Sequence, residues 1–156
     1  MLRIFLIALP LALTGCWGAP MSVLSIGSSP DQAYALESIE GLKEGSWRAN
    51  RLMGVDTRRV PWCGHAVKYA VEKSGGTAPK HYASARAWED WGSWVPVSQM
   101  SRGDVVVFKS RASRSGRHVA IASAVKGDRV RVCGGNTRNK VHCGWRSKSR
   151  IVTVRR

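Results

Sequence analysis

A cysteine at the start of an amphipathic helix is the feature that most constrains this chain. Pro61 and Trp62 come directly before Cys63, and proline is compatible with a helix start but not with a helix interior. From Cys63 onward, small and apolar residues recur at helical spacing until Gly75 and Gly76 end the run. We therefore expect Cys63 in the first turn of a helix, where free backbone N–H groups and the helix dipole favour a thiolate.

The composition indicates one domain with a strong excess of positive charge. Of its 156 residues 44% are hydrophobic, which is enough for a single core. Twenty-five Lys and Arg stand against ten Asp and Glu, so the formal net charge is +15. A chain with this charge is attracted to polyanions. Since the sequence has neither zinc-finger spacing nor an aromatic-basic RNA motif, we expect no specific nucleic-acid partner.

The N-terminal residues predict export to the periplasm or cell envelope. Residues 1–16 read as a signal peptide, because a basic residue precedes an apolar run too short to span a bilayer as a mature helix. The run closes on Leu13-Thr14-Gly15-Cys16, which resembles the lipobox of bacterial lipoproteins. Cys16 is then the lipidation site and the N-terminus a membrane anchor, the alternative being an ordinary signal with Cys16 as a bystander. A Gly-, Ser- and Pro-rich linker over 17–29 leads to the domain at 30–156.

Helical patterns precede strand patterns in this domain. Helices are expected over 31–42, from Cys63 to the two glycines and over 82–92, with a loop over 47–59. After Pro96, short apolar runs separated by turn residues predict strands over 105–108, 118–125, 129–133, 140–145 and 151–154, with Gly134 and Gly135 breaking the third. Helices followed by antiparallel strands predict an α+β domain.

Cys63 and His118 are the minimum for a thiol hydrolase. His118 stands at the head of the second predicted strand, and Asn136 follows the two glycines after the third. In a papain-like site the thiolate attacks an acyl carbon, the imidazolium protonates the leaving amine, and a third polar group orients the ring. Asn136 is the candidate for that role, although Asn139 and His142 are close enough in sequence to compete. Taken singly, a cysteine and a strand-boundary histidine are also ordinary structural residues.

The other cysteines suggest a disulfide rather than a metal site. No pair has CxxC spacing, so neither a metal nor another cofactor is expected. Cys133 and Cys143 flank the turn between two predicted strands, and in an exported protein they could close a disulfide across that hairpin. Such a pairing leaves Cys63 free, as a nucleophile requires.

Five segments occur in the order seen in the CHAP and NlpC-type superfamily. They are Pro61-Trp62-Cys63, Arg86-Ala87-Trp88 through Trp91-Gly92, Arg102 through Phe108, His118-Val119, and Gly134-Gly135-Asn136. The chain resembles these cysteine, histidine-dependent peptidoglycan hydrolases, many of them phage endolysins or exported wall enzymes. The resemblance implies a papain-like fold with N-terminal helices packed on a small antiparallel sheet. It also implies Cys63 as nucleophile, His118 as base and Asn136 as the third residue, while His65 and Ala120 depart from the usual pattern.

The implied function is hydrolysis of an amide bond in peptidoglycan, either as an N-acetylmuramoyl-L-alanine amidase or as a stem-peptide or cross-bridge endopeptidase. Expected partners are peptidoglycan and other anionic envelope polymers, which a basic protein attracts. Trp62, Arg114 and Arg117 are the expected substrate contacts. The alternative is a basic envelope-binding lipoprotein that keeps the fold without catalysis.

Overall fold

The computed structural model describes residues 31–156. The predicted signal peptide, lipobox and linker, including Cys16, lie outside the described residues. Among the helices of residues 31–156, none combines the length and apolar character needed to cross a bilayer.

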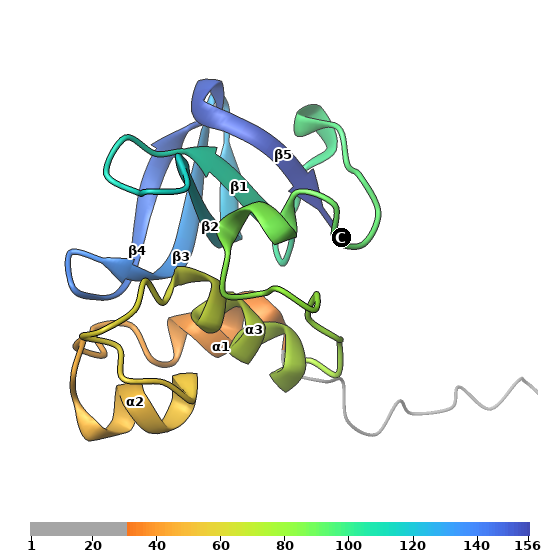
Figure 1. Ribbon diagram of the computed structural model, residues 1–156. Helices are drawn as coiled ribbons and strands as arrows, with labels where there is room; N and C mark the ends of the chain where they lie inside the picture. The colour runs from red at the N-terminus through yellow and green to blue at the C-terminus, as the bar shows by residue number, and fades with distance from the viewer. Residues whose placement is uncertain (1–30) are drawn as a thin grey trace, which may run out of the picture.

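In this part of the chain, α-helices come first and an antiparallel sheet follows, so the α+β prediction is confirmed (Figure 1). The helices are α1 (Gln32–Glu37), α2 (Trp47–Met53) and α3 (Cys63–Lys73), with 3-10 turns η1 (Ala85–Trp88), η2 (Val97–Gln99) and η3 (Lys148–Arg150). The strands are β1 (Val105–Lys109), β2 (Arg117–Lys126), β3 (Arg129–Thr137), β4 (Lys140–Ser147) and β5 (Ile151–Arg155). Their order across the sheet is β4-β3-β2-β1-β5, so the last strand returns to pair with the first.

The prediction of a loop over 47–59 is wrong, because α2 occupies its first half. Ser46 accepts a hydrogen bond from the Ala49 N–H at 3.2 Å, and Gly54 ends the helix with a left-handed φ of 68°. These are standard start and stop signals. The apolar stripe that would have drawn attention to them is thin, since only Ala49 and Met53 of this helix are buried.

Two predicted helices are shorter in the structure than expected. The first, α1, ends at Glu37 instead of residue 42, and the segment over 82–92 holds only the 3-10 turn η1. In that segment the indole N–H of Trp88 donates to the Tyr82 carbonyl at 2.9 Å, and that of Trp91 donates to the Thr77 carbonyl at 2.8 Å. The two tryptophans therefore stabilise irregular backbone through these hydrogen bonds.

The third strand continues where it was expected to break. Gly134 and Gly135 are buried inside β3. A Cβ on Gly135 would lie 2.5 Å from a ring carbon of Trp62, and one on Gly134 would lie 3.0 Å from the Ala120 Cβ. The glycines thus allow close packing on both faces of the strand.

Apolar residues form two clusters on opposite faces of the sheet, because strand side chains alternate. The cluster on the helix side takes from β1 and β2 the residues Val105, Val107, Val119 and Ile121. The cluster on the other side takes Val106, Phe108, Ala120 and Ala122. Cys63 belongs to the first cluster, so α3 packs its first residue on the helix-side face.

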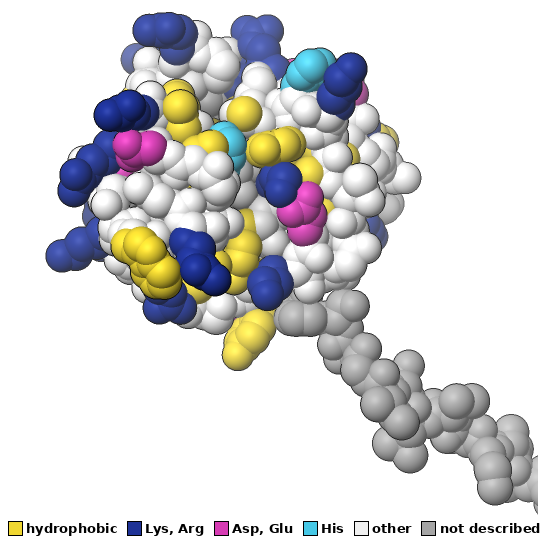
Figure 2. Space-filling model, turned by 60° about the horizontal axis from the view of Figure 1, so that its bottom comes forward, with side chains coloured by type: hydrophobic (Ala, Val, Ile, Leu, Met, Phe, Trp, Pro, Cys, Tyr) yellow, Lys and Arg dark blue, Asp and Glu magenta, His cyan; other side chains and the backbone are white. Residues whose placement is uncertain are grey.

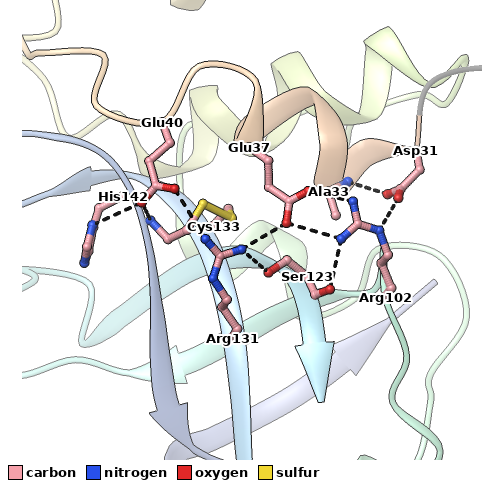
Figure 3. A network of polar contacts seen from close by, with 10 residues as sticks. Asp31, Ala33, Glu37, Glu40, Arg102, Ser123, Arg131, Cys133 and His142 are labelled. Carbon is pink, nitrogen blue, oxygen red and sulfur yellow. Dashed lines mark hydrogen bonds and ion pairs between the residues drawn. A yellow bond between two sulfur atoms is a disulfide. The ribbon is translucent and has the colours of Figure 1, made fainter. Parts of the chain in front are cut away.

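An ion-pair network, here called the α1 network, joins α1 to the sheet (Figure 3). Its members are Asp31, Glu37, Glu40, Arg102 and Arg131. Glu37 lies between the two guanidinium groups, 2.6 Å from Arg102 and 3.0 Å from Arg131. The hydrogen bond from Arg102 is the main cause of the lowered pKa of Glu37. Glu40 lies 3.3 Å from Arg131 and also accepts the backbone N–H of Cys143 at 3.0 Å.

The predicted disulfide is confirmed. Cys133 and Cys143 face each other across β3 and β4 and are covalently bonded. Among the cysteines of residues 31–156, Cys63 is the one with a free thiol.

Candidate functional site

Cys63 is the first residue of α3 and is 7% exposed. The preceding residue, Trp62, is the N-cap and makes no side-chain capping hydrogen bond. Burial raises the pKa of the Cys63 thiol, while the backbone N–H groups of Val119, Gly64 and Cys63 itself partly offset that rise. The resting side chain is therefore a neutral thiol at neutral pH.

His118 is the second residue of β2 and is paired in register with Phe108. Strand alternation puts it on the same face as Ala120, away from α3. Its Nε2 lies 3.4 Å from the Thr137 hydroxyl, and Gly134 leaves room beside the ring. Burial and then repulsion from Arg146 lower the pKa of His118 to about 4, so the imidazole is neutral at neutral pH.

Cys63 lies near the start of β2, because the backbone N–H of Val119, the residue after His118, is close enough to the sulfur to lower its pKa. Their side chains nevertheless line different hollows. Cys63 lines one of about 270 Å³ together with Pro61, and His118 lines another of about 460 Å³. In the part of the chain that the structure describes, no hydrogen bond joins the two side chains. The papain-like pair therefore remains a prediction.

Asn136 shares the hollow of His118, with a left-handed φ of 55°. The hydroxyl within hydrogen-bond distance of the ring belongs instead to Thr137, a residue that no sequence pattern singles out. Of the two competitors, His142 lies 3.6 Å from Glu40, and Asn139 accepts the Glu44 N–H through its carbonyl at 2.8 Å. The ring of His142 is thus engaged with Glu40, the contact of Asn139 is through its backbone alone, and the role of Asn136 stays a prediction.

The three predicted substrate contacts lie in different environments. Trp62 is fully buried and its indole N–H donates to Glu44 at 3.0 Å, so it is a core residue and not a substrate contact in this conformation. Arg117 is paired with Glu89 at 2.7 Å. Arg114 is exposed and lines the same hollow as Cys63, which makes it the best placed of the three.

His65, which departs from the superfamily pattern, faces the core. It is 6% exposed, and its Nδ1 lies 3.2 Å from the Met53 carbonyl. Within residues 31–156, His, Cys, Asp and Glu nowhere form a group of three that could hold a metal ion.

The hollow beside His118 is the most basic feature near the candidate site, and we call it the basic cavity. Phe108, His118, Asn136 and Thr137 form part of its wall. Its five cationic residues are Lys109, Arg111, Arg138, Arg146 and Arg150. Basic side chains are not confined to this cavity, because Figure 2 shows many Lys and Arg on the helix-bearing side, around a patch of apolar side chains.

Comparison with known proteins shows a likeness of fold. Neither a family model nor a curated protein matches the sequence. Among solved structures, a lipoprotein-like protein of the NLP/P60 family from Staphylococcus aureus subsp. aureus Mu50 is 16% identical, with a TM-score of 0.52. The alignment covers 83% of this chain and 41% of that one. The fold is NlpC/P60-like. The structure of Ly7917 aligns at 14% identity and a TM-score of 0.41, over 82% of this chain and 62% of that one.

Proposed function

We propose that this protein is an exported cysteine hydrolase that cuts an amide bond in peptidoglycan, with Cys63 as nucleophile and His118 as general base. One observation carries the proposal. The first turn of α3 places the Cys63 sulfur against the start of β2, beside the residue that follows His118. This meeting of a helix start and a strand start, in an NlpC/P60-like fold, is the arrangement in which a thiol and an imidazole can work together.

The protonation states define how the reaction would start. Burial raises the pKa of Cys63 and lowers that of His118 to about 4, so the resting pair is neutral. His118 takes the thiol proton as the sulfur attacks the acyl carbon, and then gives it to the leaving amine. The backbone N–H of Cys63 stabilises the oxyanion, and water hydrolyses the thioester.

This chemistry requires the imidazole to leave Thr137 and turn toward the sulfur. Because strand alternation directs the His118 side chain away from α3, rotation of that side chain alone does not bring the ring to the sulfur, and the backbone at the start of β2 would also have to move. Substrate binding would supply the free energy for that movement.

A second candidate function has its own support. The side chains of Cys63 and His118 line separate hollows, and Cys63 is only 7% exposed. These features suit a basic envelope-binding protein that keeps the fold without catalysis.

Dye release from purified peptidoglycan distinguishes the two functions. We expect Cys63→Ala and His118→Gln to reduce the rate at least about a thousandfold, because each removes one member of a nucleophile–base pair. The exposed His81 lies outside the site, so His81→Gln serves as the matched control and should keep wild-type activity. Mass spectrometry of the fragments identifies the bond that is cut.

Two outcomes would contradict catalysis by this pair. Unchanged lysis by a folded Cys63→Ala variant would exclude Cys63 as nucleophile. Sedimentation of the wild-type protein with peptidoglycan, without any lysis, would favour the binding function.

A further inference from the structure

The basic cavity contains positive charge without any negative charge. Every one of the chain's ten Asp and Glu lies within residues 31–156, and none of them lines the cavity. Residues 1–30 contain neither Asp nor Glu.

Two arginines of the cavity, Arg146 and Arg150, differ from the arginines that pair with carboxylates elsewhere in the fold. Arg131 and Arg156 each contact carboxylates, at 3.0 Å and 2.7 Å. Arg150 donates to the Lys109 carbonyl at 2.9 Å, and no ion pair within 4.0 Å involves Arg146 in residues 31–156. Burial, and then repulsion from Arg150 and Arg138, lowers the pKa of Arg146. Such a cluster disfavours the folded state, and unbalanced charge of this kind is typical of a ligand-binding site.

We propose that the basic cavity binds a phosphate group, with Arg146 and Arg150 as its main ligands. A guanidinium group presents paired N–H donors that match phosphate oxygens, and phosphate supplies up to two negative charges at pH 7. A volume of about 460 Å³ admits such a group together with part of the molecule that carries it. A stem peptide with free amino groups is less suitable, because its ammonium groups would meet a lining whose charged side chains are all cationic.

Because His118 lies in the cavity wall, its pKa should change when phosphate binds. Repulsion from Arg146 contributes to the lowered pKa of about 4. A bound anion offsets that repulsion and favours the imidazolium, so the pKa of His118 rises when phosphate binds.

Titration calorimetry of the full chain with inorganic phosphate tests the proposal. The Cys63→Ala variant is used, so that binding is measured whether or not the protein is a hydrolase. We expect saturable binding to one site that weakens as salt is added. Arg146→Gln and Arg150→Gln should each raise the Kd about tenfold, the usual effect of losing one charge-assisted hydrogen bond. Arg48 is exposed on α2 and does not line the cavity, so Arg48→Gln should leave the Kd unchanged.

NMR titration measures the pKa of His118, which non-specific attraction of phosphate to the basic surface would not change. Phosphate should raise the pKa of His118 in the Cys63→Ala protein, and should do so much less when Arg146→Gln is added. Phosphate that binds without affecting His118, or an equal loss of affinity in the Arg48→Gln control, would overturn the assignment of the site.

Two further probes define the chemistry of the ligand. Succinate, a dicarboxylate, should bind at least about tenfold more weakly than phosphate, because it cannot place its charge on one compact group. Tighter binding of succinate, or no saturable phosphate binding, would overturn the proposal. Glycerol phosphate polymers and free phosphate both support it, and a lower Kd per phosphate for the polymer would identify an envelope polymer as the source.

Discussion

The α1 network and the basic cavity use the same kind of residue in opposite ways. Arg131 on β3 and Arg146 on β4 are both half-buried and lie on neighbouring strands. Arg131 meets Glu37 from α1, 94 residues away along the chain, whereas the charged neighbours that act on Arg146 are Arg150 and Arg138. The difference lies in the carboxylates that α1 and the residues beside it supply to Arg131. An arginine on this sheet that meets a carboxylate therefore stabilises the fold, whereas an arginine that meets none is available to bind an anion.

Reduction of the Cys133–Cys143 disulfide should have the largest effect, because it joins the two strands that carry both regions. The sequence separation is 10, and closing a loop of this size in the unfolded chain corresponds to about 2–3 kcal/mol. Urea unfolding with and without reductant measures the loss. A Cys133→Ser/Cys143→Ser double variant is the control and should no longer respond to reductant. Equal unfolding midpoints for the wild-type protein under both conditions would contradict this role of the disulfide.

As the pH falls, the protein should lose the stability that neutral His118 contributes before it loses the stability that ionised Glu37 contributes. The pKa of His118 is about 4 in the folded protein against an ordinary 6.5, so the unfolded state binds the proton more readily between these values. Stability should therefore fall as the pH drops through this window, by about 3 kcal/mol in total. Glu37 has a pKa lowered from 4.5, so its contribution is intact above that pH and is lost as the pH falls below it.

The His118→Gln variant isolates this effect. Its stability between pH 6.5 and 4.5 should fall less than that of the wild-type protein, and the remaining decrease belongs partly to His65, whose pKa burial also lowers. Added phosphate should reduce the wild-type decrease if it raises the pKa of His118. An identical pH profile for wild type and variant would show that His118 is not buried uncharged.

The smallest expected effects come from two matched substitutions, which should change the free energy of unfolding in opposite directions. Arg131→Gln should destabilise the protein by about 1 kcal/mol, because it leaves Glu37 and Glu40 with one cation fewer. Arg146→Gln should stabilise the protein by about 0.5 kcal/mol, because it removes a half-buried charge repelled by its neighbours. Denaturant midpoints at low salt measure both. The same sign for the two substitutions would mean that the regions do not differ as described.

Much of the fold could be predicted from local patterns. The start of α3 at Cys63 and the strands on both sides of the turn at 127–128 follow from periodicity and turn residues, which act over a few positions. The helix α2 was missed although Ser46 and Gly54 mark its ends, because its apolar stripe is thin. The continuation of β3 through Gly134 and Gly135 could not be predicted, since it depends on Trp62 and Ala120 packing against the two glycines.

The candidate site also combines features that local sequence patterns predict with features that depend on tertiary packing. Cys63 and His118 were found as residue types at the starts of predicted elements, and the disulfide partners were found from their places around one turn. The burial of Trp62 and the contact of Thr137 with His118 depend on which face of the sheet each side chain occupies. A register shift of one residue would reverse these faces, so local pattern alone does not decide them.

By itself the sequence determined the charge excess, the α+β order of elements and the helix start that carries the cysteine, because composition and periodicity are local properties. Tertiary structure alone decided which arginines meet carboxylates and which form the basic cavity. The reason is distance along the chain: Glu37 and Arg131 become partners only when α1 packs on the sheet, and no acidic residue is brought to Arg146.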